Sequence, residues 1–146
     1  MFVGEKTQLK ASPTELSFVW TSEDTEVATV DSNGLVTAMG DGSTHIVASS
    51  GEKTCRVPLT SITKIPLTGF NLGTTFVALS RTGKRTLVVA LEPSNANDAS
   101  VPEWRSNNTD VVTVDYRGEI VAVGIGTTNV VCTINNMDRT VVVNVQ

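Results

Sequence analysis

The 146-residue chain contains one histidine and two cysteines, which leaves little material for a metal site or a catalytic dyad. A zinc site needs several Cys or His ligands at suitable spacing, and no such ligand stands near His45. His45 lies in a strand-like run and is expected to be an exposed strand residue. No serine has an evident partner base, so nucleophilic catalysis lacks its second member. The sequence predicts no enzyme, no metal and no cofactor.

Long apolar runs and clustered positive charge are also missing. No segment approaches the roughly 20 apolar residues that span a bilayer, so membrane insertion is not expected. Residues 1–5 lack a basic start followed by an apolar stretch, and we expect no secretory signal in this chain. Lys plus Arg number 11 against 15 Asp plus Glu, and the acidic excess lies within residues 1–61. Nucleic acid is therefore not expected as a partner.

Valine, threonine and isoleucine are abundant. They supply 22, 21 and 6 residues, or 49 of 146, which favours strands over long helices. Cys55 and Cys132 each lie within a strand-like run and are predicted to be separate buried thiols that act as small apolar residues. Two cysteines are too few to indicate a disulfide-stapled secreted fold.

The chain contains an internal duplication at an offset of 84 residues. When Trp20 is placed over Trp104, residues 20–61 align with residues 104–145 without a gap, and 14 of the 42 positions are identical. Chance matching would give roughly three to five identities. A repeat of this quality indicates two copies of one structural unit.

Alternation of apolar and polar residues with a period of two predicts short antiparallel strands in both copies. The residues predicted to form the core are Phe18, Trp20, Val30 and Ile46 in the first copy and Trp104, Val114 and Val130 in the second. Turn signals separate the runs, because Asp caps a type I turn and Gly accepts a positive φ. The predicted turn residues are Asp31 and Gly34, and Asp115 and Gly118. Without any helical period, this pattern predicts antiparallel β-sandwiches.

The two copies differ upstream of the tryptophan. Before Trp104 lie three strand-like segments, whereas only one clear segment, at about Lys6–Ala11, precedes Trp20. One of the three, Leu87–Leu91, is apolar at every position, which allows burial on both faces. The first copy is therefore predicted to lack its opening strand and to expose part of its core. Three explanations stay open: an excerpt from a longer protein, a strand donated by a neighbouring chain, or a smaller sandwich.

We place the two domains at residues 1–61 and 66–146. The connecting residues 60–66 are short and partly apolar, so we expect limited freedom between the domains.

The residues after each tryptophan resemble the bacterial immunoglobulin-like (Ig-like) domain of group 2. The resemblance rests on Trp20 to Ala38 with the following Gly40 and Gly42, and on the matching stretch from Trp104 to Ala122 with Gly124 and Gly126. It implies an all-β fold of two tandem Ig-like antiparallel β-sandwiches, the first lacking its opening strand. It also implies the setting of invasin- and intimin-like adhesins, enzyme appendages and phage virion proteins. Fold likeness alone does not assign function.

Two residue groups are candidates for binding. Acidic residues gather after each tryptophan, and oxygens recurring there suggest calcium, but a solvated, turn-forming loop explains the same residues and is the favoured interpretation. The calcium candidates are Asp24, Asp31, Asp110 and Asp115. The tryptophans could stack on sugars, but their alternation points inward, which leaves Tyr116 as the expected exposed aromatic.

An outward-facing apolar stripe is the remaining candidate. Val47, Val131 and Val142 have the outward parity, which suggests either an interface or scattered surface valines. Pro58, at the place of Val142, suits an edge strand.

The leading hypothesis is a non-enzymatic spacer or adhesion segment of a bacterial cell-surface or secreted protein, located extracellularly. Its partners would be other protein modules, a surface receptor or a glycan. The alternatives are a phage virion or surface-assembly subunit, which the truncated first copy supports, and a carbohydrate-binding accessory module, which would need more exposed aromatics.

Overall fold

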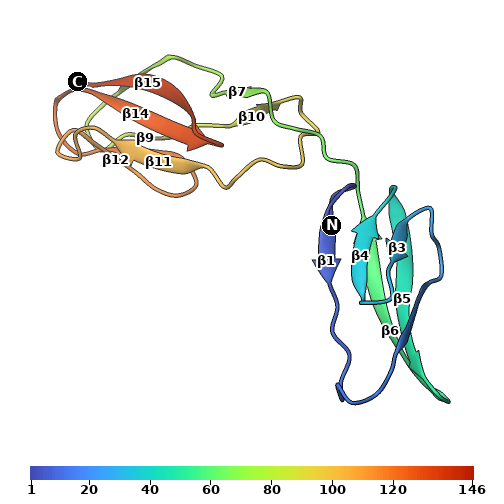
Figure 1. The fold of residues 1–146 in the computed structure, drawn as a ribbon. Coiled ribbons are helices and arrows are strands. Elements are labelled where there is room, and N and C mark those ends of the chain that lie inside the picture. Colours follow the sequence, from blue (N-terminus) through green and yellow to red (C-terminus); the bar gives the residue numbers. More distant parts are fainter. The chain divides into compact units, whose positions relative to one another are not determined.

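The computed structural model describes residues 1–146 and is all-β (Figure 1). It divides into two compact units, unit 1 from Met1 to Lys64 and unit 2 from Ile65 to Gln146. The strands of unit 1 are β1 (Lys6–Gln8), β2 (Val19–Ser22), β3 (Ala28–Val30), β4 (Leu35–Ala38), β5 (Gly42–Ser50) and β6 (Lys53–Ser61). The strands of unit 2 are β7 (Gly69–Asn71), β8 (Phe76–Leu79), β9 (Lys84–Thr86), β10 (Ala90–Glu92), β11 (Glu103–Ser106), β12 (Val112–Val114), β13 (Glu119–Ala122), β14 (Gly126–Ile134) and β15 (Met137–Val145). No helix capable of crossing a membrane is present.

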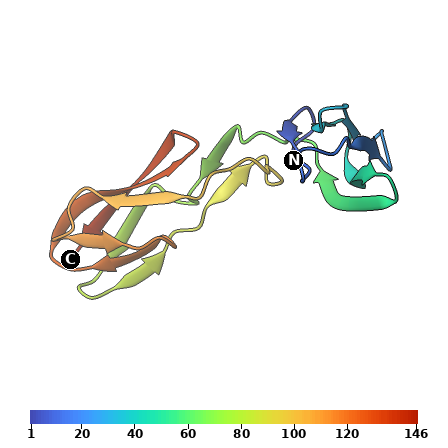
Figure 2. The same ribbon diagram turned by 60° about the horizontal axis from the view of Figure 1, so that its bottom comes forward.

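Unit 2 is a β-sandwich, and Figure 2 shows its strands in two layers. One layer has the order β11-β14-β15-β8, and the other has the order β12-β13-β9. All neighbours are antiparallel except β8 and β15, which run parallel. A short pair, β7 with β10, completes the unit. The opening segment of unit 2 comprises β7 and β8. It therefore contributes first to the pair with β10 and then to the edge of the larger sheet.

The core of unit 2 is continuous and deeply buried. Residues from both layers and from the opening segment form one apolar cluster, against which Trp104 packs partly buried. The fully buried side chains include Phe70, Ile120 and Val130. Phe70 belongs to β7, so the opening segment is an integral part of this core.

Unit 1 repeats the same plan with fewer strands. Its layers are β2-β5-β6 and β1-β4-β3, which correspond to β11-β14-β15 and β9-β13-β12 of unit 2. No strand of unit 1 corresponds to β7 or β8. The core is accordingly small: Ala28, Val36 and Ile46 form the buried cluster. The predicted all-β fold of two tandem sandwiches, the first without its opening strand, is confirmed.

Two predictions, one for a cysteine and one for a valine, differ from the structure. Cys55 is exposed, not buried; it lies near the hairpin end of β6, and the equivalent residue of β15, Arg139, is exposed as well. Val131 is buried although its parity is outward. It lies on the central strand β14, where its cross-strand neighbours, Arg105 on β11 and Thr140 on β15, flank it on the same face.

The run Leu87–Leu91 is also buried on one face only. Leu87 is buried and Val89 and Leu91 are half-buried, whereas Val88 is 69% exposed. This run connects β9, the edge strand of one layer, to β10 of the short pair, and only one of its sides meets the core.

Candidate functional site

The two tryptophans occupy equivalent, half-buried positions in their units. Trp20 lies on β2 and packs against the unit 1 cluster, and Trp104 lies on β11 and packs against the unit 2 core. Each indole lies against the glycine of the turn that follows. A Cβ on Gly34 would stand 2.9 Å from Cζ2 of Trp20, and one on Gly118 would stand 2.7 Å from Cζ2 of Trp104.

Val30 and Val114 are likewise half-buried at their cores, and Ile46 and Val130 are fully buried. Phe18 is half-buried beside the open side of unit 1 rather than in its buried cluster.

Asp31 and Asp115 each organise the tight turn between two strands. Oδ1 of Asp31 accepts hydrogen bonds from the backbone N–H groups of Asn33 and Leu35, at 2.8 and 2.9 Å. Oδ1 of Asp115 accepts the equivalent bonds from Arg117 and Glu119, at 2.9 and 2.8 Å. The carboxylates therefore act on the chain's own backbone, which is the usual task of Asp at the first position of a turn.

The other two calcium candidates lie in the loop after each tryptophan. Oδ1 of Asp24 accepts a hydrogen bond from the N–H of Glu26 at 2.9 Å. In unit 2 the amide oxygen of Asn108 does the same for Asp110, at 3.0 Å. A neutral amide thus replaces the carboxylate at this place, so the loop does not depend on negative charge. The structure brings no three His, Cys, Asp or Glu side chains together in a group suited to a metal.

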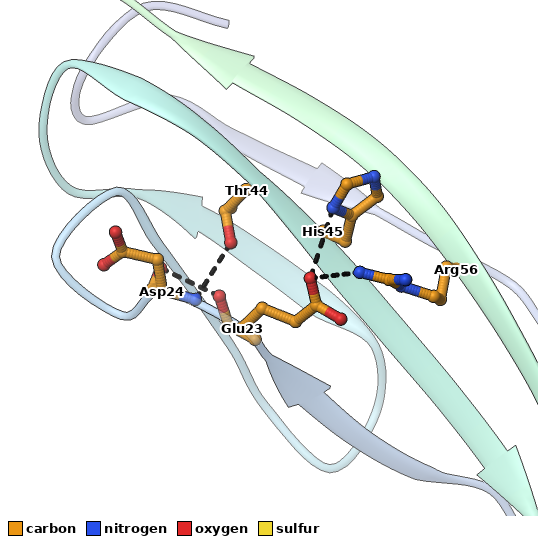
Figure 3. A network of polar contacts seen from close by, with 6 residues as sticks. Glu23, Asp24, Thr44, His45 and Arg56 are labelled. Carbon is orange, nitrogen blue, oxygen red and sulfur yellow. Dashed lines mark hydrogen bonds and ion pairs between the residues drawn. The ribbon is translucent and has the colours of Figure 1, made fainter.

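A polar network in unit 1 links the loop that follows β2 to strands β5 and β6 (Figure 3). Oε2 of Glu23 lies 3.2 Å from Nδ1 of His45 on β5 and 2.5 Å from Nη2 of Arg56 on β6. Oγ1 of Thr44 accepts a hydrogen bond from the N–H of Asp24 at 2.9 Å. The ionic side chains are 41–56% exposed, so this pairing contributes about 1 kcal/mol or less.

This network has no counterpart in unit 2. The equivalent positions hold Asn107, Asn129 and Thr140, none of which carries a charge. Within the network, Thr44 is buried and its hydroxyl oxygen accepts a hydrogen bond from the backbone of Asp24, so this hydroxyl has a structural role. The cluster is suited to holding strands together at the surface. Sequence alone carries no signal for it, because the three residues lie on three separate segments of the chain.

Cys132 is fully buried on β14, and Cys55 is an exposed free thiol on β6. Burial, with a smaller contribution from Asp138, raises the pKa of the Cys132 thiol to about 11. Cys132 is therefore a neutral thiol at physiological pH. Only Cys55 is open to reagents.

Tyr116 is 74% exposed at the tip of its turn. Its hydroxyl accepts a hydrogen bond from Nε of Arg117 at 2.8 Å, and the Arg117 guanidinium lies 5.1 Å from the centre of its ring. One isolated ring with an arginine packed over it offers little area for stacking on a sugar.

The predicted apolar stripe is reduced to two separated positions. Val131 is buried, Val47 is half-buried and Val142 is 36% exposed. Val142 on β15 is paired with Phe76 on β8, which is the edge strand of the sheet. Val142 therefore lies next to the sheet edge.

A groove with a volume of about 480 Å³ lies on unit 1 and has both polar and apolar lining residues. Its apolar lining comes from Leu9, Leu16, Phe18 and Trp20. Leu9 and Trp20 also pack against the core cluster, so the groove leads directly into the core. The missing strand predicts an exposed core here, but sequence alone does not show which side chains line the opening.

Comparison with known proteins identifies the architecture. The bacterial Ig-like domain (group 2) family matches residues 3–61 and again residues 66–145. Intimin of Escherichia coli O157:H7 is 50% identical over 46 residues, covering 32% of this chain and 5% of intimin. Ice-binding protein 1 of Shewanella frigidimarina is 32% identical over 105 residues, covering 70% of this chain and 12% of that protein. The chain spans only a small part of the length of these relatives.

Solved structures show the same fold. Domains 4–9 of the surface layer protein SbsC superpose with a TM-score of 0.51 at 22% identity, covering 97% of this chain and 24% of that chain. Domains 4 and 5 of the same S-layer protein give a TM-score of 0.50 at 22% identity, covering 96% of this chain and 78% of that chain. Together with the duplicated tryptophan units, these matches show that the chain belongs to the bacterial Ig-like domain (group 2) family and contains two tandem members of it.

Proposed function

We propose that the two units form a non-enzymatic, load-bearing spacer segment of a bacterial surface or secreted protein. The resemblance to parts of intimin and of an S-layer protein supports a role at the cell surface. In this role the sandwiches hold other modules at a distance, and their loops offer contacts to partner proteins. The property that this role requires is resistance to unfolding under force, and that resistance depends on how the terminal strands are paired.

The parallel pairing of β8 with β15 carries this proposal. Force applied along the chain enters unit 2 at the start of its opening segment and leaves at the end of β15. Because the two strands run parallel and are paired from Val142 with Phe76 to Val145 with Leu79, such force loads their hydrogen bonds in shear. All the bonds of a sheared ladder resist together, whereas an antiparallel hairpin pulled at its open end loses its bonds one at a time.

Backbone bonds beyond the ladder extend this clamp. The N–H of Val142 donates to the carbonyl of Thr75 at 2.9 Å, and the N–H of Gln146 donates to the carbonyl of Leu79 at 3.0 Å. Unit 1 has a shorter version, a single parallel bridge between Phe2 and Ile62. Unit 2 is therefore expected to resist more force than unit 1.

Single-molecule stretching of the full chain tests this function. We expect two unfolding events, the stronger one releasing the 82 residues of unit 2 at about 3.5 Å of length per residue. Val142→Pro removes the N–H that Thr75 accepts, and unit 1 already tolerates Pro58 at this place. This variant should lower the unfolding force of unit 2 alone.

Val142→Ala is the matched control, because it keeps the N–H while also removing the valine side chain. Its unfolding force should stay near that of the original chain. Unfolding of unit 2 without measurable resistance would contradict a load-bearing role. Equal forces for the Pro and Ala variants would show that the parallel pairing is not the clamp.

Adhesion through the loops is the second role that the relatives support. A crystal structure of an intimin fragment contains a receptor domain bound to it, which is a property of that protein. For this chain, binding of a receptor or glycan is a proposal that retention on cells or a glycan array would test. The relatives named above are not virion proteins, so they give the virion alternative no support.

A further inference from the structure

Unit 1 contains the only Asn-Gly dipeptide of the chain, Asn33-Gly34. It lies in the tight turn between β3 and β4, and the side chain of Asn33 is exposed. Asparagine followed by glycine is the sequence most prone to spontaneous deamidation, because glycine has no side chain to hinder attack by its own backbone nitrogen. Every other asparagine of the chain is followed by a residue with a side chain. Asn33 is therefore the position at which the unfolded chain should deamidate first.

Deamidation proceeds through a cyclic imide. The backbone nitrogen of Gly34 loses its proton to base and attacks Cγ of Asn33, and the bond from Cγ to Nδ2 breaks. Nδ2 takes up a proton and leaves as ammonia. Water then opens the imide at one of its two carbonyl groups. The products are aspartate, which keeps the original main chain, and isoaspartate, whose main chain runs through Cβ and Cγ and is one atom longer.

The folded turn holds both polar atoms of the peptide group that must move. The N–H of Gly34 donates to the carbonyl of Asp31 at 3.0 Å. Nε2 of Gln8, on β1, donates to the carbonyl of Asn33 at 2.7 Å. Ring closure rotates this peptide group about ψ of Asn33 and needs the Gly34 nitrogen without its proton. Both hydrogen bonds must therefore break before the ring can form.

The backbone angles of the turn also oppose ring closure. The hydrogen bond from Gly34 to Asp31 closes a four-residue turn in which Asn33 does not have a positive φ, so the turn is type I and not type II. At this position of a type I turn ψ is about 0°. The ring requires a different ψ, which brings Cβ of Asn33 nearly into line with the nitrogen of Gly34. The native turn is thus a conformation from which the reaction cannot start.

Unit 2 has the same turn without the reactive residue and without the residue that holds it. Arg117 stands in the place of Asn33. Thr86 stands in the place of Gln8, since Gln8 pairs with Leu35 on β4 as Thr86 pairs with the equivalent residue on β13. Thr86 carries no amide group and makes no side-chain hydrogen bond to the turn. The amide of Gln8 is therefore found in the unit that has the reactive asparagine.

We propose that Asn33 is a deamidation site that the folded turn blocks and that opening of unit 1 exposes. Gln8 is a positioning residue that keeps the site closed by holding the carbonyl of Asn33. The proposal goes beyond the spacer function and does not rest on it. It sets a chemical limit on unit 1, because each opening allows a fraction of the chains to react irreversibly.

The isoaspartate product does not fit the native turn. Gly34 lies against the indole of Trp20, where a Cβ would stand 2.9 Å from Cζ2, and its carbonyl accepts a hydrogen bond from the N–H of Leu9 at 2.9 Å. One more main-chain atom before Gly34 displaces the glycine from at least one of these contacts. Formation of isoaspartate should therefore destabilise unit 1 and leave unit 2 unchanged, so a chain that has reacted opens more readily.

Mass spectrometry of the full chain during incubation at mildly alkaline pH tests the proposal. A peptide of residues 26–40 gives the reference rate for the unfolded sequence. We expect Asn33 to deamidate at least about tenfold more slowly in the folded chain than in the peptide, because reaction requires local opening. In concentrated urea the chain and the peptide should react at the same rate. Equal rates without urea would overturn the proposal, and so would faster deamidation of another asparagine in urea.

Two variants test the role of Gln8. Gln8→Ala removes the donor to Asn33 and should speed deamidation of the folded chain about fivefold, as expected for loss of one neutral hydrogen bond. Lys6→Ala is the matched control, since Lys6 is exposed on the same face of β1 and its side chain makes no hydrogen bond. It should leave the rate unchanged. Equal rates for the two variants would overturn the assignment of Gln8, whereas both should react alike in urea.

The effect of the product is measured on the isoaspartate form, separated by chromatography and identified by enzymatic methylation of its carboxylate. The melting temperature of unit 1 should fall and that of unit 2 should not. Asn33→Asp is the matched control, because it makes the same change of charge without lengthening the main chain, and it should melt near the original chain. An isoaspartate form that melts like Asn33→Asp would overturn the predicted damage to the turn. None of these measurements applies force, so their failure is distinct from failure of the spacer function.

Discussion

The indole of Trp104 lies directly against Gly118, with room for no side chain between them. Gly118 has φ of +81° and is buried, and a Cβ there would also stand 2.9 Å from the carbonyl oxygen of Leu87. Gly34 and Trp20 repeat the relationship in unit 1 with the same φ. Each turn glycine is therefore required for two reasons: its positive φ, and the indole ring packed against it.

Gly118→Ala should destabilise unit 2 by about 3 kcal/mol, since it combines an unfavourable φ with displacement of a packed indole. Chemical denaturation followed by tryptophan fluorescence measures this change. Gly73→Ala is the control, because Gly73 has φ of +67° and no atom lies within 4 Å of the place that a methyl group would take. It should lose only about 1 kcal/mol. Similar losses for both variants would mean that the indole contact is unimportant.

Val57 and Val141 form a matched pair for testing the open side of unit 1. Val141→Ala empties a fully buried site and should cost about 2–3 kcal/mol, whereas Val57→Ala should cost about 1 kcal/mol or less. Two-domain unfolding curves fitted for each unit separately provide the measurement. If the two substitutions cost the same, Val57 must be covered in solution by something else.

Asp115→Ala should destabilise unit 2 by about 1–2 kcal/mol, because two backbone N–H groups lose their acceptor. Asp115→Asn keeps an oxygen in place and should cost less. Thermal melting gives the comparison, repeated with calcium and with a chelator. A calcium-dependent rise that Asp115→Asn abolishes would instead assign the carboxylate to a calcium site.

Stability should fall between pH 9 and pH 11 through Cys132. Its thiol has an ordinary pKa of 9.0 when unfolded and about 11 when folded, so the unfolded chain loses the proton first. The contribution is complete below pH 9 and is lost as the pH rises towards 11, by up to about 3 kcal/mol. Urea denaturation at intervals across this range measures the slope.

The variant Cys132→Ala isolates this effect from other groups that titrate in the same range. Its free energy of unfolding should fall less steeply than that of the original chain. Parallel slopes would show that Cys132 is not buried as described.

Much of the fold follows from local pattern. The 84-residue repeat, the alternation around Trp20 and Trp104, and the Asp-to-Gly turns are sufficient to predict two sandwiches and the missing strand. These features are local because a strand's inward face and a turn's backbone angle are set by neighbouring residues. Exposure is harder to predict, as Cys55 and Val131 show. Alternation assigns each of them to a face of its strand, but coverage of that face depends on strands that are distant in sequence.

The sequence by itself determined that this chain is all-β, built twice from one unit, and that its first unit is short of a strand. Only the tertiary structure decided what that absence leaves open. The groove over Leu9 and Trp20 and the uncovered edge of β6 are formed by segments that are far apart in the chain. Their positions therefore follow only from the tertiary structure. Burial depends on how the layers assemble. Two equivalent valines therefore differ, because Val141 is buried and Val57 is exposed.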